Sequence, residues 1–353
     1  SVPTPIQYQA IPPAIRGNDI VGIAQTGTGK TLAFGLPLLQ RLHEIRGGMG
    51  LIVLPTRELA IQVEEMLQKI GRSLGLATAV LIGGEGMGRQ IAALRRRPNV
   101  IIATPGRLLD HIESGNLRLD KVGIVVLDEA DRMLDIGFAP QIKKILSLVP
   151  TKRQTMLFSA TMPPEIVKLA ASYMASPVRV EVAPTGTASE LVDQEIFLVE
   201  KGSKLKLLGE LLDENRGTVL VFSRTKHGAR KLYRAVRDMG HKGAEIHSNK
   251  TLGQRREAMS GFKTGKYRVL VATDIAARGI DVQGIGLVVN YDLPDNTLDY
   301  VHRIGRTGRA GEVGKAISFA TPDQKRDVLD IERLVRKQIP LKPHGDTTFT
   351  TSA

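Results

Sequence analysis

The chain has 353 residues, which is more than one ordinary core organises and suits two domains of about 150 to 180 residues each. Hydrophobic residues make up 42% of it, no stretch approaches the roughly 20 apolar residues of a membrane span, and no basic-then-apolar leader opens it, so we expect a cytosolic globular protein. The absence of cysteine excludes disulfides and thiolate metal sites, and the net charge of +13, spread over both halves, suits a polyanionic partner such as nucleic acid.

Apolar, β-branched runs alternate with helical patterns along the whole chain. In the first half these runs are Ile20–Ile23, Gly50–Leu54, Ala77–Ile82, Val100–Ala103, Ile124–Leu127 and Thr155–Phe158. In the second half they are Ile196–Val199, Thr218–Phe222, Gly243–Ile246, Val269–Ala272, Gly286–Asn290 and Gly314–Phe319. Uninterrupted apolar strands that alternate with helices indicate an α/β fold, here two tandem domains that each hold a mostly parallel sheet with helices on both faces.

The stretch 183–189, with the sequence APTGTAS, has the composition of a flexible linker. The predicted divisions are a first domain at 1–183, a linker at 184–190, a second domain at 191–342 and a disordered, Thr-rich tail at 343–353. Ligands of open parallel sheets bind beyond the carboxyl ends of the strands. Each conspicuous motif follows a strand in this way, so we expect the main site in a cleft between the two domains.

The first motif is AQTGTGKT at Ala24–Thr31, between the run Ile20–Ile23 and a helical stretch. Its glycines let the main chain turn its amides onto phosphates, Lys30 adds positive charge for the β- and γ-phosphates, and the Thr31 hydroxyl is placed for Mg²⁺. The predicted nucleotide-binding residues are Thr26, Gly27, Thr28, Gly29, Lys30 and Thr31. The alternative is a chance Gly-rich turn, and Ala24 does replace the usual first glycine.

The second motif is IVVLDEAD at Ile124–Asp131, an apolar run that ends in acids. Asp128 at the end of the strand is placed to hold Mg²⁺, and Glu129 to orient and deprotonate an attacking water. A solvated strand end is the alternative, and the apolar lead-in weighs against it. With the phosphate loop, this motif predicts a nucleoside triphosphatase.

A third motif, HRIGRTGR at His302–Arg309, lies in the second half. Phosphoryl transfer needs positive charge on the γ-phosphate, which an arginine finger usually supplies. We predict that Arg306 and Arg309 do so and that they act with Lys30, Asp128 and Glu129 in catalysis. A surface helix or an RNA-facing patch remains the alternative for this segment taken alone.

Eight motifs occur in a fixed order: TPIQ, AQTGTGKT, PTRELA, TPGR, DEAD, SAT, ATDIAARGID and HRIGRTGR. From Pro3 to about Thr321 the chain resembles the DEAD-box ATP-dependent RNA helicases of helicase superfamily 2. The resemblance implies two RecA-like domains, ATP and Mg²⁺ as cofactors, and RNA-stimulated ATP hydrolysis. It also implies that hydrolysis is coupled to cleft closure, clamping of single-stranded RNA and local unwinding of short duplexes.

By the same resemblance, Gln7 reads the adenine edge, with Thr4 and Pro5 shaping its loop, and Asp281 contacts the ribose. A side-chain amide offers the donor and acceptor that adenine needs. Gly279 fits close approach of the backbone to the nucleotide. The family's aromatic residue upstream of this loop has no counterpart here, so we expect reduced affinity for adenine.

The resemblance also implies residues that couple the ATP state to RNA binding. These are Asp131, Ser159, Thr161, Arg278, His302 and Arg303. The hydroxyls of Ser159 and Thr161 are placed to bond either Asp131 or the region of His302. A local turn after the strand is the alternative role for the SAT segment.

The RNA contacts that the resemblance implies consist of hydroxyls, glycines and arginines, which suit a sugar–phosphate track and read no base sequence. They are Pro55, Thr56, Arg57, Gly83, Gly84, Thr104, Pro105, Gly106, Arg107, Arg224, Thr225, Arg255 and Thr273. Leu252 stands where the family commonly has Gln, which weakens the assignment around Arg255. Because aromatic residues make up only 4% of the chain, we expect sequence-independent binding of single-stranded RNA or short duplexes.

Three rival functions remain open at this stage. They are an ATP-gated RNA clamp that separates no strands, a DNA-directed remodelling ATPase, and an inactive RNA-binding module. The intact set of Lys30, Asp128, Glu129, Arg306 and Arg309 argues against the last of these. We expect a monomeric core taken from a longer protein, with no membrane association, and the sequence identifies no protein partner.

Overall fold

The computed structural model of the protein describes residues 2–24, 27–44, 47–182, 192–277, 285–308 and 314–345. The chain forms two compact units, Ser1–Thr185 and Gly186–Ala353, each with its own sheet. The division falls within the stretch 184–190 that the sequence suggests as a linker. Residues 183–191 themselves lie outside the described part of the chain.

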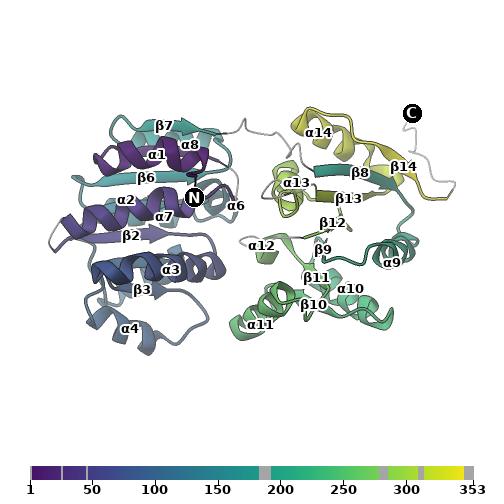
Figure 1. The fold of residues 1–353 in the computed structure, drawn as a ribbon, viewed down its shortest axis with the longest axis horizontal. Coiled ribbons are helices and arrows are strands. Elements are labelled where there is room, and N and C mark those ends of the chain that lie inside the picture. Colours follow the sequence, from purple (N-terminus) through teal and green to yellow (C-terminus); the bar gives the residue numbers. More distant parts are fainter. Residues whose placement is uncertain are drawn as a thin grey trace. The chain divides into compact units, whose positions relative to one another are not determined.

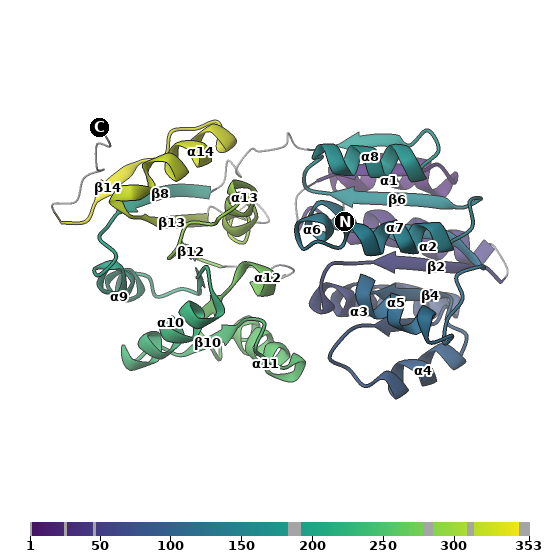
Figure 2. The same ribbon diagram turned by 180° about the vertical axis from the view of Figure 1, so that it is seen from behind.

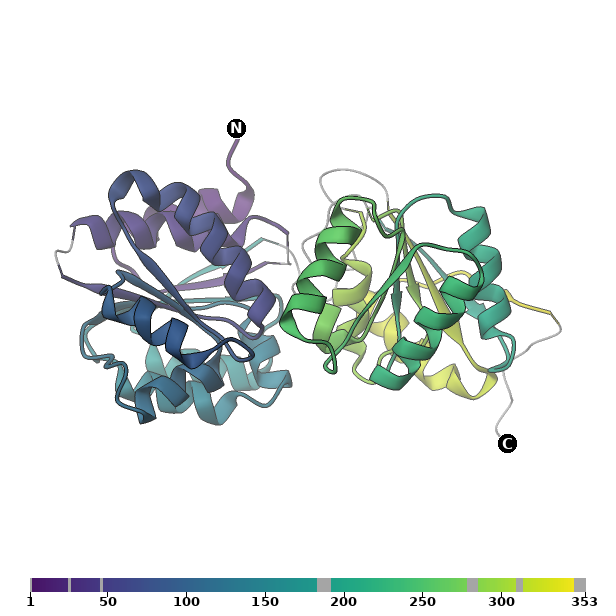
Figure 3. The ribbon, with the colours of Figure 1, turned by 90° about the horizontal axis from the view of Figure 1, so that it is seen from below.

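The first unit is a parallel sheet with the strand order β3-β4-β2-β5-β6-β1-β7. Its strands are β1 (Ile20–Ile23), β2 (Met49–Val53), β3 (Thr78–Leu81), β4 (Val100–Ala103), β5 (Val122–Leu127), β6 (Gln154–Ser159) and β7 (Val178–Glu181). Its helices are α1 (Pro5–Ile15), α2 (Lys30–Glu44), α3 (Arg57–Gly71), α4 (Met87–Arg95), α5 (Pro105–Glu113), α6 (Ala130–Asp135), α7 (Ala139–Leu148) and α8 (Pro164–Tyr173), with a short 3-10 turn at Arg72–Leu74. Helices α1, α2 and α3 cover one face (Figure 1) and α5, α7 and α8 the other (Figure 2), and Figure 3 shows the sheet between these two layers.

The second unit repeats this topology, with the parallel order β10-β11-β9-β12-β13-β8-β14. Its strands are β8 (Val192–Leu198), β9 (Val219–Phe222), β10 (Gly243–Ile246), β11 (Val269–Ala272), β12 (Leu287–Asn290), β13 (Gly314–Ala320) and β14 (Leu341–Pro343). Its helices are α9 (Lys204–Glu214), α10 (Lys226–Asp238), α11 (Leu252–Lys263), α12 (Asp274–Ala277), α13 (Thr297–Ile304) and α14 (Lys325–Val335), with a 3-10 turn at Pro322–Gln324. Each strand of the second unit therefore has a counterpart seven strands earlier in the chain.

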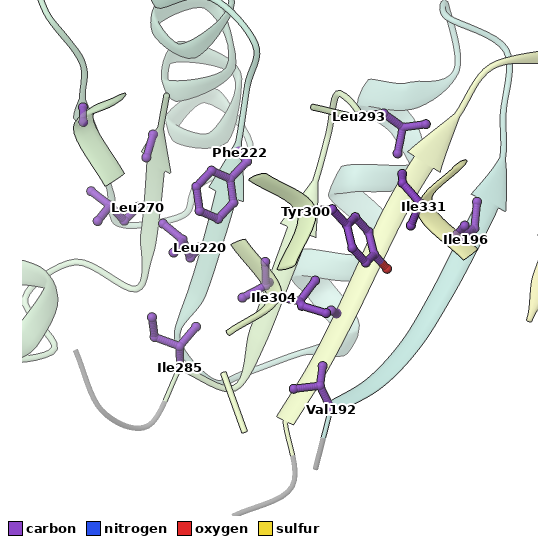
Figure 4. Packing of buried hydrophobic residues seen from close by; sticks show 14 of the residues in the cluster. Val192, Ile196, Leu220, Phe222, Leu270, Ile285, Leu293, Tyr300, Ile304 and Ile331 are labelled. Carbon is purple, nitrogen blue, oxygen red and sulfur yellow. The ribbon is translucent and has the colours of Figure 1, made fainter. Parts of the chain in front are cut away.

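Both faces of each sheet are buried, which explains why the strands read as continuous apolar runs. In β9, Val219 and Val221 pack against α9 and α10, whereas Leu220 and Phe222 pack on the opposite face with α11, α13 and α14. Figure 4 shows Leu220 and Phe222 on the side of the sheet that also holds Tyr300 of α13. Fully burying one such aliphatic or aromatic side chain contributes roughly 1.5–3 kcal/mol, so each unit has a substantial core on both sides.

Several helices begin at residues suited to capping. The Oγ1 atoms of Thr56 and Thr225 accept hydrogen bonds from the N–H groups of Leu59 and Gly228, at 3.4 and 2.9 Å, and so start α3 and α10. Such caps contribute about 1 kcal/mol each.

None of the helices that the structure describes is long and apolar enough to cross a membrane.

The predicted fold class is confirmed, and every strand that the apolar runs predict is present. The largest difference at a strand end is in β8, which begins at Val192 rather than Ile196. The sequence did not predict β7 and β14, which are edge strands with mostly exposed side chains and therefore have no apolar run. Pro343, predicted to begin the tail, pairs with Leu198 in β14, whereas residues 346–353 lie beyond the described part.

Candidate nucleotide and RNA sites

The loop between β1 and α2 has a backbone that requires glycine. Gly27 and Gly29 have φ values of +88° and +91°, in the left-handed region that other residues adopt only with strain. The loop leads directly into Lys30, the first residue of α2, so the free N–H groups of the helix start lie beside it. This geometry fits a phosphate-binding loop; Thr26, also predicted to belong to it, lies outside the described residues.

The Lys30 side chain is only 6% exposed, and its Nζ atom makes no hydrogen bond within the described residues. A buried ammonium group without a partner is costly, and such groups in folded proteins normally meet an anion or an acceptor. Phosphate oxygens would satisfy it. Lys30 is therefore the clearest physical sign that this loop holds an anionic ligand.

Two acids follow β5 and lie close to this loop. The Asp128 N–H donates to Val53 O at 3.1 Å, which extends the pairing of β5 with β2 and places a 4%-exposed carboxyl at the strand end. Burial raises the pKa of Asp128 to about 6, the Lys30 ammonium opposes this rise, and Glu129 adds to it. A buried carboxyl group with an elevated pKa beside an unpartnered ammonium is a common feature of functional sites.

Glu129 adopts a left-handed backbone, with φ +52° and ψ +51°, where β5 turns into α6. Such a conformation in a residue other than glycine is strained and clusters at functional sites. The carboxylate of Glu129 forms a buried ion pair with Arg132, which the sequence gave no reason to expect. The pair fixes the position of the predicted catalytic base.

The SAT segment bonds directly to the acidic motif. The Asp131 carboxylate accepts hydrogen bonds from Thr161 N at 2.9 Å and from Thr161 Oγ1 at 2.8 Å. The Asp131 N–H donates to Ser159 Oγ at 3.1 Å. Of the two partners predicted for these hydroxyls, the structure therefore has Asp131, so the ends of the neighbouring strands β5 and β6 are tied together.

The Gln7 amide connects α1 to the phosphate loop. Its Nε2 donates to Gly29 O at 3.1 Å and its Oε1 accepts from Thr4 N at 3.0 Å. One N–H and one lone pair of the amide remain for a further ligand. Adenine recognition by Gln7 thus stays a prediction, and the contact with Gly29 is an additional role that the sequence did not indicate.

The predicted RNA contacts of the first unit lie at the carboxyl ends of β3, β4 and β2, three adjacent strands. The Arg57 guanidinium lies against the backbone of Gly83 and Gly84, where an added Cβ on Gly83 would come 2.9 Å from Arg57 Nη2. Gly84 has a φ of +77°. Arg107 Nη1 donates to Glu85 O at 3.0 Å. Two predicted RNA-binding arginines therefore hold one glycine-containing loop.

Two buried polar side chains, Gln90 and His111, support the same loop. Gln90 Nε2 donates to Ile82 O at 2.9 Å, and Gln90 Oε1 lies 3.1 Å from Nε2 of His111, whose ring is fully buried. Burial lowers the pKa of His111, Arg107 lowers it further, and Asp110 opposes the change. The sequence did not identify Gln90 or His111, because a polar residue on an amphipathic helix carries no sign of what it meets in the fold.

In the second unit, the buried Arg303 guanidinium makes several contacts within the protein. Its guanidinium binds both carboxylate oxygens of Asp274 at 2.5 and 2.7 Å, donates to Asn290 Oδ1 and to the Asp292 carbonyl, and lies over the Phe222 ring. It ties α13 to the start of α12 and the end of β12. Arg303 therefore acts first as a structural brace.

The other residues of this motif are described only in part. The His302 ring lies 3.7 Å from Asp299, and the His302 carbonyl accepts from Arg306 Nε at 3.1 Å. Four predicted site residues of the second unit lie outside the described residues: Arg278, Gly279, Asp281 and Arg309.

The predicted RNA contacts of the second unit follow β9, β10 and β11, which correspond to β2, β3 and β4. Arg224 and Thr225 follow β9, with Arg224 Nε 3.2 Å from Asp295, and Thr273 follows β11. Arg255 lies in α11 after β10, whereas Leu252 at the start of that helix is buried. Equivalent edges of the two sheets thus hold both sets.

The position that corresponds to Lys30 is Lys204, the first residue of α9 after β8. Lys204 is also buried, but its ammonium donates to Tyr291 O at 2.9 Å and pairs with Asp292 at 3.6 Å. The second unit therefore neutralises internally the charge that the first unit leaves without a partner among its described residues.

Comparison with known proteins agrees with this arrangement. The DEAD/DEAH box helicase family matches residues 4–169, and the helicase conserved C-terminal domain matches residues 203–311. The chain is 43% identical to the ATP-dependent RNA helicase DbpA of Bacillus subtilis over 96% of this chain and 71% of that protein, and 44% identical to the DEAD-box ATP-dependent RNA helicase CshA of the same organism over 95% and 68%.

Solved structures extend the comparison to three dimensions. S. cerevisiae Dbp5 bound to RNA and ADP BeF3 has a TM-score of 0.86 at 30% identity, covering 97% of this chain and 90% of that one. Mss116p bound to ssRNA and AMP-PNP has a TM-score of 0.89 at 29% identity, covering 98% and 75%. With the two RecA-like sheets and the motif geometry, these matches show that the chain belongs to the DEAD-box ATP-dependent RNA helicases.

Proposed function

We propose that this helicase hydrolyses ATP with the residues at the carboxyl ends of β1, β5 and β6. The observation that carries the proposal is the buried Lys30 ammonium, which has no hydrogen-bond partner in the described part of the chain and lies near Asp128. The loop amides and Lys30 bind the β- and γ-phosphates, while the free N–H and lone pair of Gln7 face adenine. The predicted contacts of Asp281 and Gly279 complete the nucleotide site.

Mg²⁺ fits the donors that this site offers. The described residues contain no group of three or more His, Cys, Asp or Glu side chains placed to hold a metal by themselves. Asp128 and the Thr31 hydroxyl supply oxygen ligands, which Mg²⁺ prefers, and it usually takes the rest from phosphates and water. When bound, it neutralises the negative charge that develops on the phosphates.

Glu129 acts as the base in the chemical step. It takes a proton from a water that attacks the γ-phosphorus, the bond from that phosphorus to the bridging oxygen breaks, and ADP and phosphate leave. The ion pair with Arg132 supports this role by fixing the Glu129 carboxylate. Arg306 and Arg309 of the second unit supply positive charge to the γ-phosphate when the two units close on the nucleotide.

RNA binds along the other half of each sheet edge. In the first unit the candidate contacts follow β3, β4 and β2, and in the second they follow β10, β11 and β9. These are hydroxyls, glycines and arginines suited to phosphates, so we propose sequence-independent binding of a single strand. The solved relatives with bound RNA support this assignment.

ATP and RNA are coupled through the ties between strand ends. The Asp131 bonds to Thr161 and Ser159 join the nucleotide motif to the end of β6. We propose that both ligands favour a closed arrangement of the two units, in which a short duplex loses pairing locally, and that product release reopens it. A strand-displacement assay with a short duplex separates unwinding from clamping alone. A monomeric core and a cytosolic location stay predictions.

Glu129→Gln tests the catalytic assignment. The amide cannot accept the proton, so we expect RNA-stimulated ATP hydrolysis to fall by roughly 10² to 10⁴-fold, while ATP and RNA binding persist. Hydrolysis is measured by phosphate release and binding by fluorescence anisotropy. Full turnover in the variant would remove Glu129 from the role of base.

A further inference from the structure

The outer face of α10 is a dense basic surface. The helix packs against β10 and β11 and buries Ala229, Leu232 and Val236. Its opposite side is exposed and carries Lys226, His227, Arg230, Lys231, Arg234 and Arg237. The single acid of the helix, Asp238, is its last residue.

Within the described residues, the lysines and arginines of this face make none of the ion pairs that some other exposed cations of the second unit make. Arg224 pairs with Asp295, Lys266 with Glu257, and Lys342 with Glu195. By contrast, no carboxylate of the described residues pairs with any of the Lys or Arg side chains of the α10 outer face, which are Lys226, Arg230, Lys231, Arg234 and Arg237. Like charges four residues apart, such as Arg230 and Arg234, destabilise a helix by about 0.2–0.5 kcal/mol per pair. An anionic partner outside the chain would relieve this repulsion.

The basic face of α10 lines a groove, and a second groove beside it includes predicted RNA contacts. A groove of about 480 Å³ is lined by His227, Arg230, Lys231, Arg234, Ala235 and Asp238. A second groove of about 680 Å³ shares Lys231 and Ala235 with it and also includes Arg224 and Thr225. The two grooves are therefore neighbours along α10, joined at Lys231.

We propose that the α10 basic face binds the sugar–phosphate backbone of RNA that extends beyond the strand held at Arg224 and Thr225. From Lys226 to Arg237 the helix rises roughly 17 Å, which matches about five phosphates at a rise of about 3.4 Å each. An acidic protein segment is the competing partner. The smaller groove has one apolar lining residue, Ala235, whereas protein interfaces rely on apolar or aromatic anchors, so RNA is favoured there. The inference rests on the proposed RNA path only for its starting point.

The test is the salt dependence of RNA binding by the full chain. We compare wild type with the triple variant Arg230→Gln, Lys231→Gln and Arg234→Gln, using oligouridylates of about 6 and about 20 nucleotides. On the longer RNA, we expect the slope of log affinity against log salt concentration to become shallower by about 2 and affinity near 0.1 M salt to fall roughly tenfold. On the shorter RNA, which only fills the core path, we expect no change.

A matched control lies on α14 of the same unit and on Arg336, the residue that follows it. Lys325→Gln, Arg326→Gln and Arg336→Gln remove the same charges from another exposed surface and should leave both slopes unchanged. Arg230→Lys with Arg234→Lys keeps the charge and should keep the wild-type slope, since phosphate contacts of this kind need charge rather than a planar fork. Melting temperatures establish that all variants are folded.

Three results would overturn the proposal. The first is a triple variant whose salt slope on the longer RNA equals that of wild type. The second is an equal loss of affinity for both RNAs. The third is unchanged RNA binding together with a loss of polyglutamate binding, which would assign the face to an acidic protein. If wild type binds only the longer RNA, and the triple variant loses that binding, the α10 proposal stands and the proposed RNA path at the strand ends is wrong. Failure of one proposal can therefore be told from failure of the other.

Discussion

Two buried cations, Lys30 and Arg303, serve different purposes because their partners differ. Lys30 is buried beside an acidic motif with no hydrogen bond to the described residues, whereas the Arg303 guanidinium binds Asp274, Asn290 and the Asp292 carbonyl. A buried cation without a hydrogen-bond partner is available to a ligand, whereas a cation that makes several hydrogen bonds within the protein holds the fold. The motif alone does not separate these cases; the contacts do.

Arg303→Lys tests the structural role of that side chain. A lysine cannot form the two-point contact with Asp274, and it leaves the Asp274 carboxylate and the Asp292 carbonyl with fewer donors. We expect the free energy of unfolding of the second unit to fall by about 3 kcal/mol. Chemical denaturation followed by circular dichroism measures it.

Arg306→Lys is the matched comparison, since this arginine is assigned to catalysis. It should lower ATP hydrolysis, and its unfolding is measured in the same way because Arg306 is also buried. If Arg303→Lys left the unfolding midpoint unchanged, the bracing role of Arg303 would be wrong.

His111 makes the first unit sensitive to acid. Burial and Arg107 lower the pKa of His111 in the folded state, and Asp110 opposes this change. The stability that the neutral ring contributes is therefore fully present above the pKa of the unfolded chain, about 6.5. As the pH falls below that value, protonation is favoured in the unfolded chain, and stability is lost. We expect the stability of wild type to fall between pH 7 and about pH 5 more steeply than that of His111→Gln. Urea unfolding at a series of pH values measures the difference, and parallel curves would contradict it.

Sequence reasoning found the residues whose chemistry is tied to a local pattern and missed those that depend on the fold. Lys30 and Asp128 follow from short motifs, whereas for the SAT hydroxyls the sequence left two partners open, of which the structure has Asp131. The pairing of Arg132 with Glu129 is buried and local, yet no pattern distinguishes it from a solvated helix pair. The Gln90–His111 bond joins α4 to α5 across the sheet edge, and only tertiary structure brings those helices together.

At the scale of elements, burial decides which strands a sequence reveals. Interior strands such as β9 are apolar on both faces and give continuous runs, so they were predicted. The edge strands β7 and β14 have exposed side chains and depend on hydrogen bonds to one neighbour, for which the sequence has no signature. The observed strand ends differ from the predicted ones by a few residues, because main-chain hydrogen bonding, rather than side-chain hydrophobicity, determines where a strand stops pairing.

The loop between β3 and α4 depends on its glycine pair. Gly84 has a positive φ, and a Cβ there would overlap the Arg57 guanidinium. Gly84→Ala should introduce about 1–2 kcal/mol of backbone strain and displace Arg57, and thus weaken RNA binding roughly tenfold while leaving ATP binding in place. Fluorescence titration with labelled RNA measures this.

Gly88→Ala in α4 is the control for that loop. An added Cβ at Gly88 meets no atom within 4 Å, and alanine favours a helix, so RNA affinity should be unchanged. Equal losses of RNA affinity in the two variants would contradict this assignment, because Gly88→Ala disturbs neither the Gly84 backbone nor Arg57.

On the scale of the whole molecule, each unit has its own sheet and its own two-sided core. Units of this kind are expected to unfold as separate cooperative transitions. The loop, Lys30, Asp128 and Gln7 belong to the first unit, so ADP with Mg²⁺ should raise mainly the first unit's transition, by about 2.7 kcal/mol at a concentration near 100 times its dissociation constant. Differential scanning calorimetry of the full chain resolves the two. A shift confined to the second transition would contradict the assignment.

The shared strand order of the two sheets gives each unit a lysine at the same place, the start of the helix after its first strand. Asp292 and the Tyr291 carbonyl are the counterparts of Lys204 in the second unit, whereas Lys30 Nζ makes no hydrogen bond within the described residues. A triphosphate that approached Lys204 would have to compete with these internal partners, so we expect phosphate affinity to reside at Lys30 rather than at its counterpart.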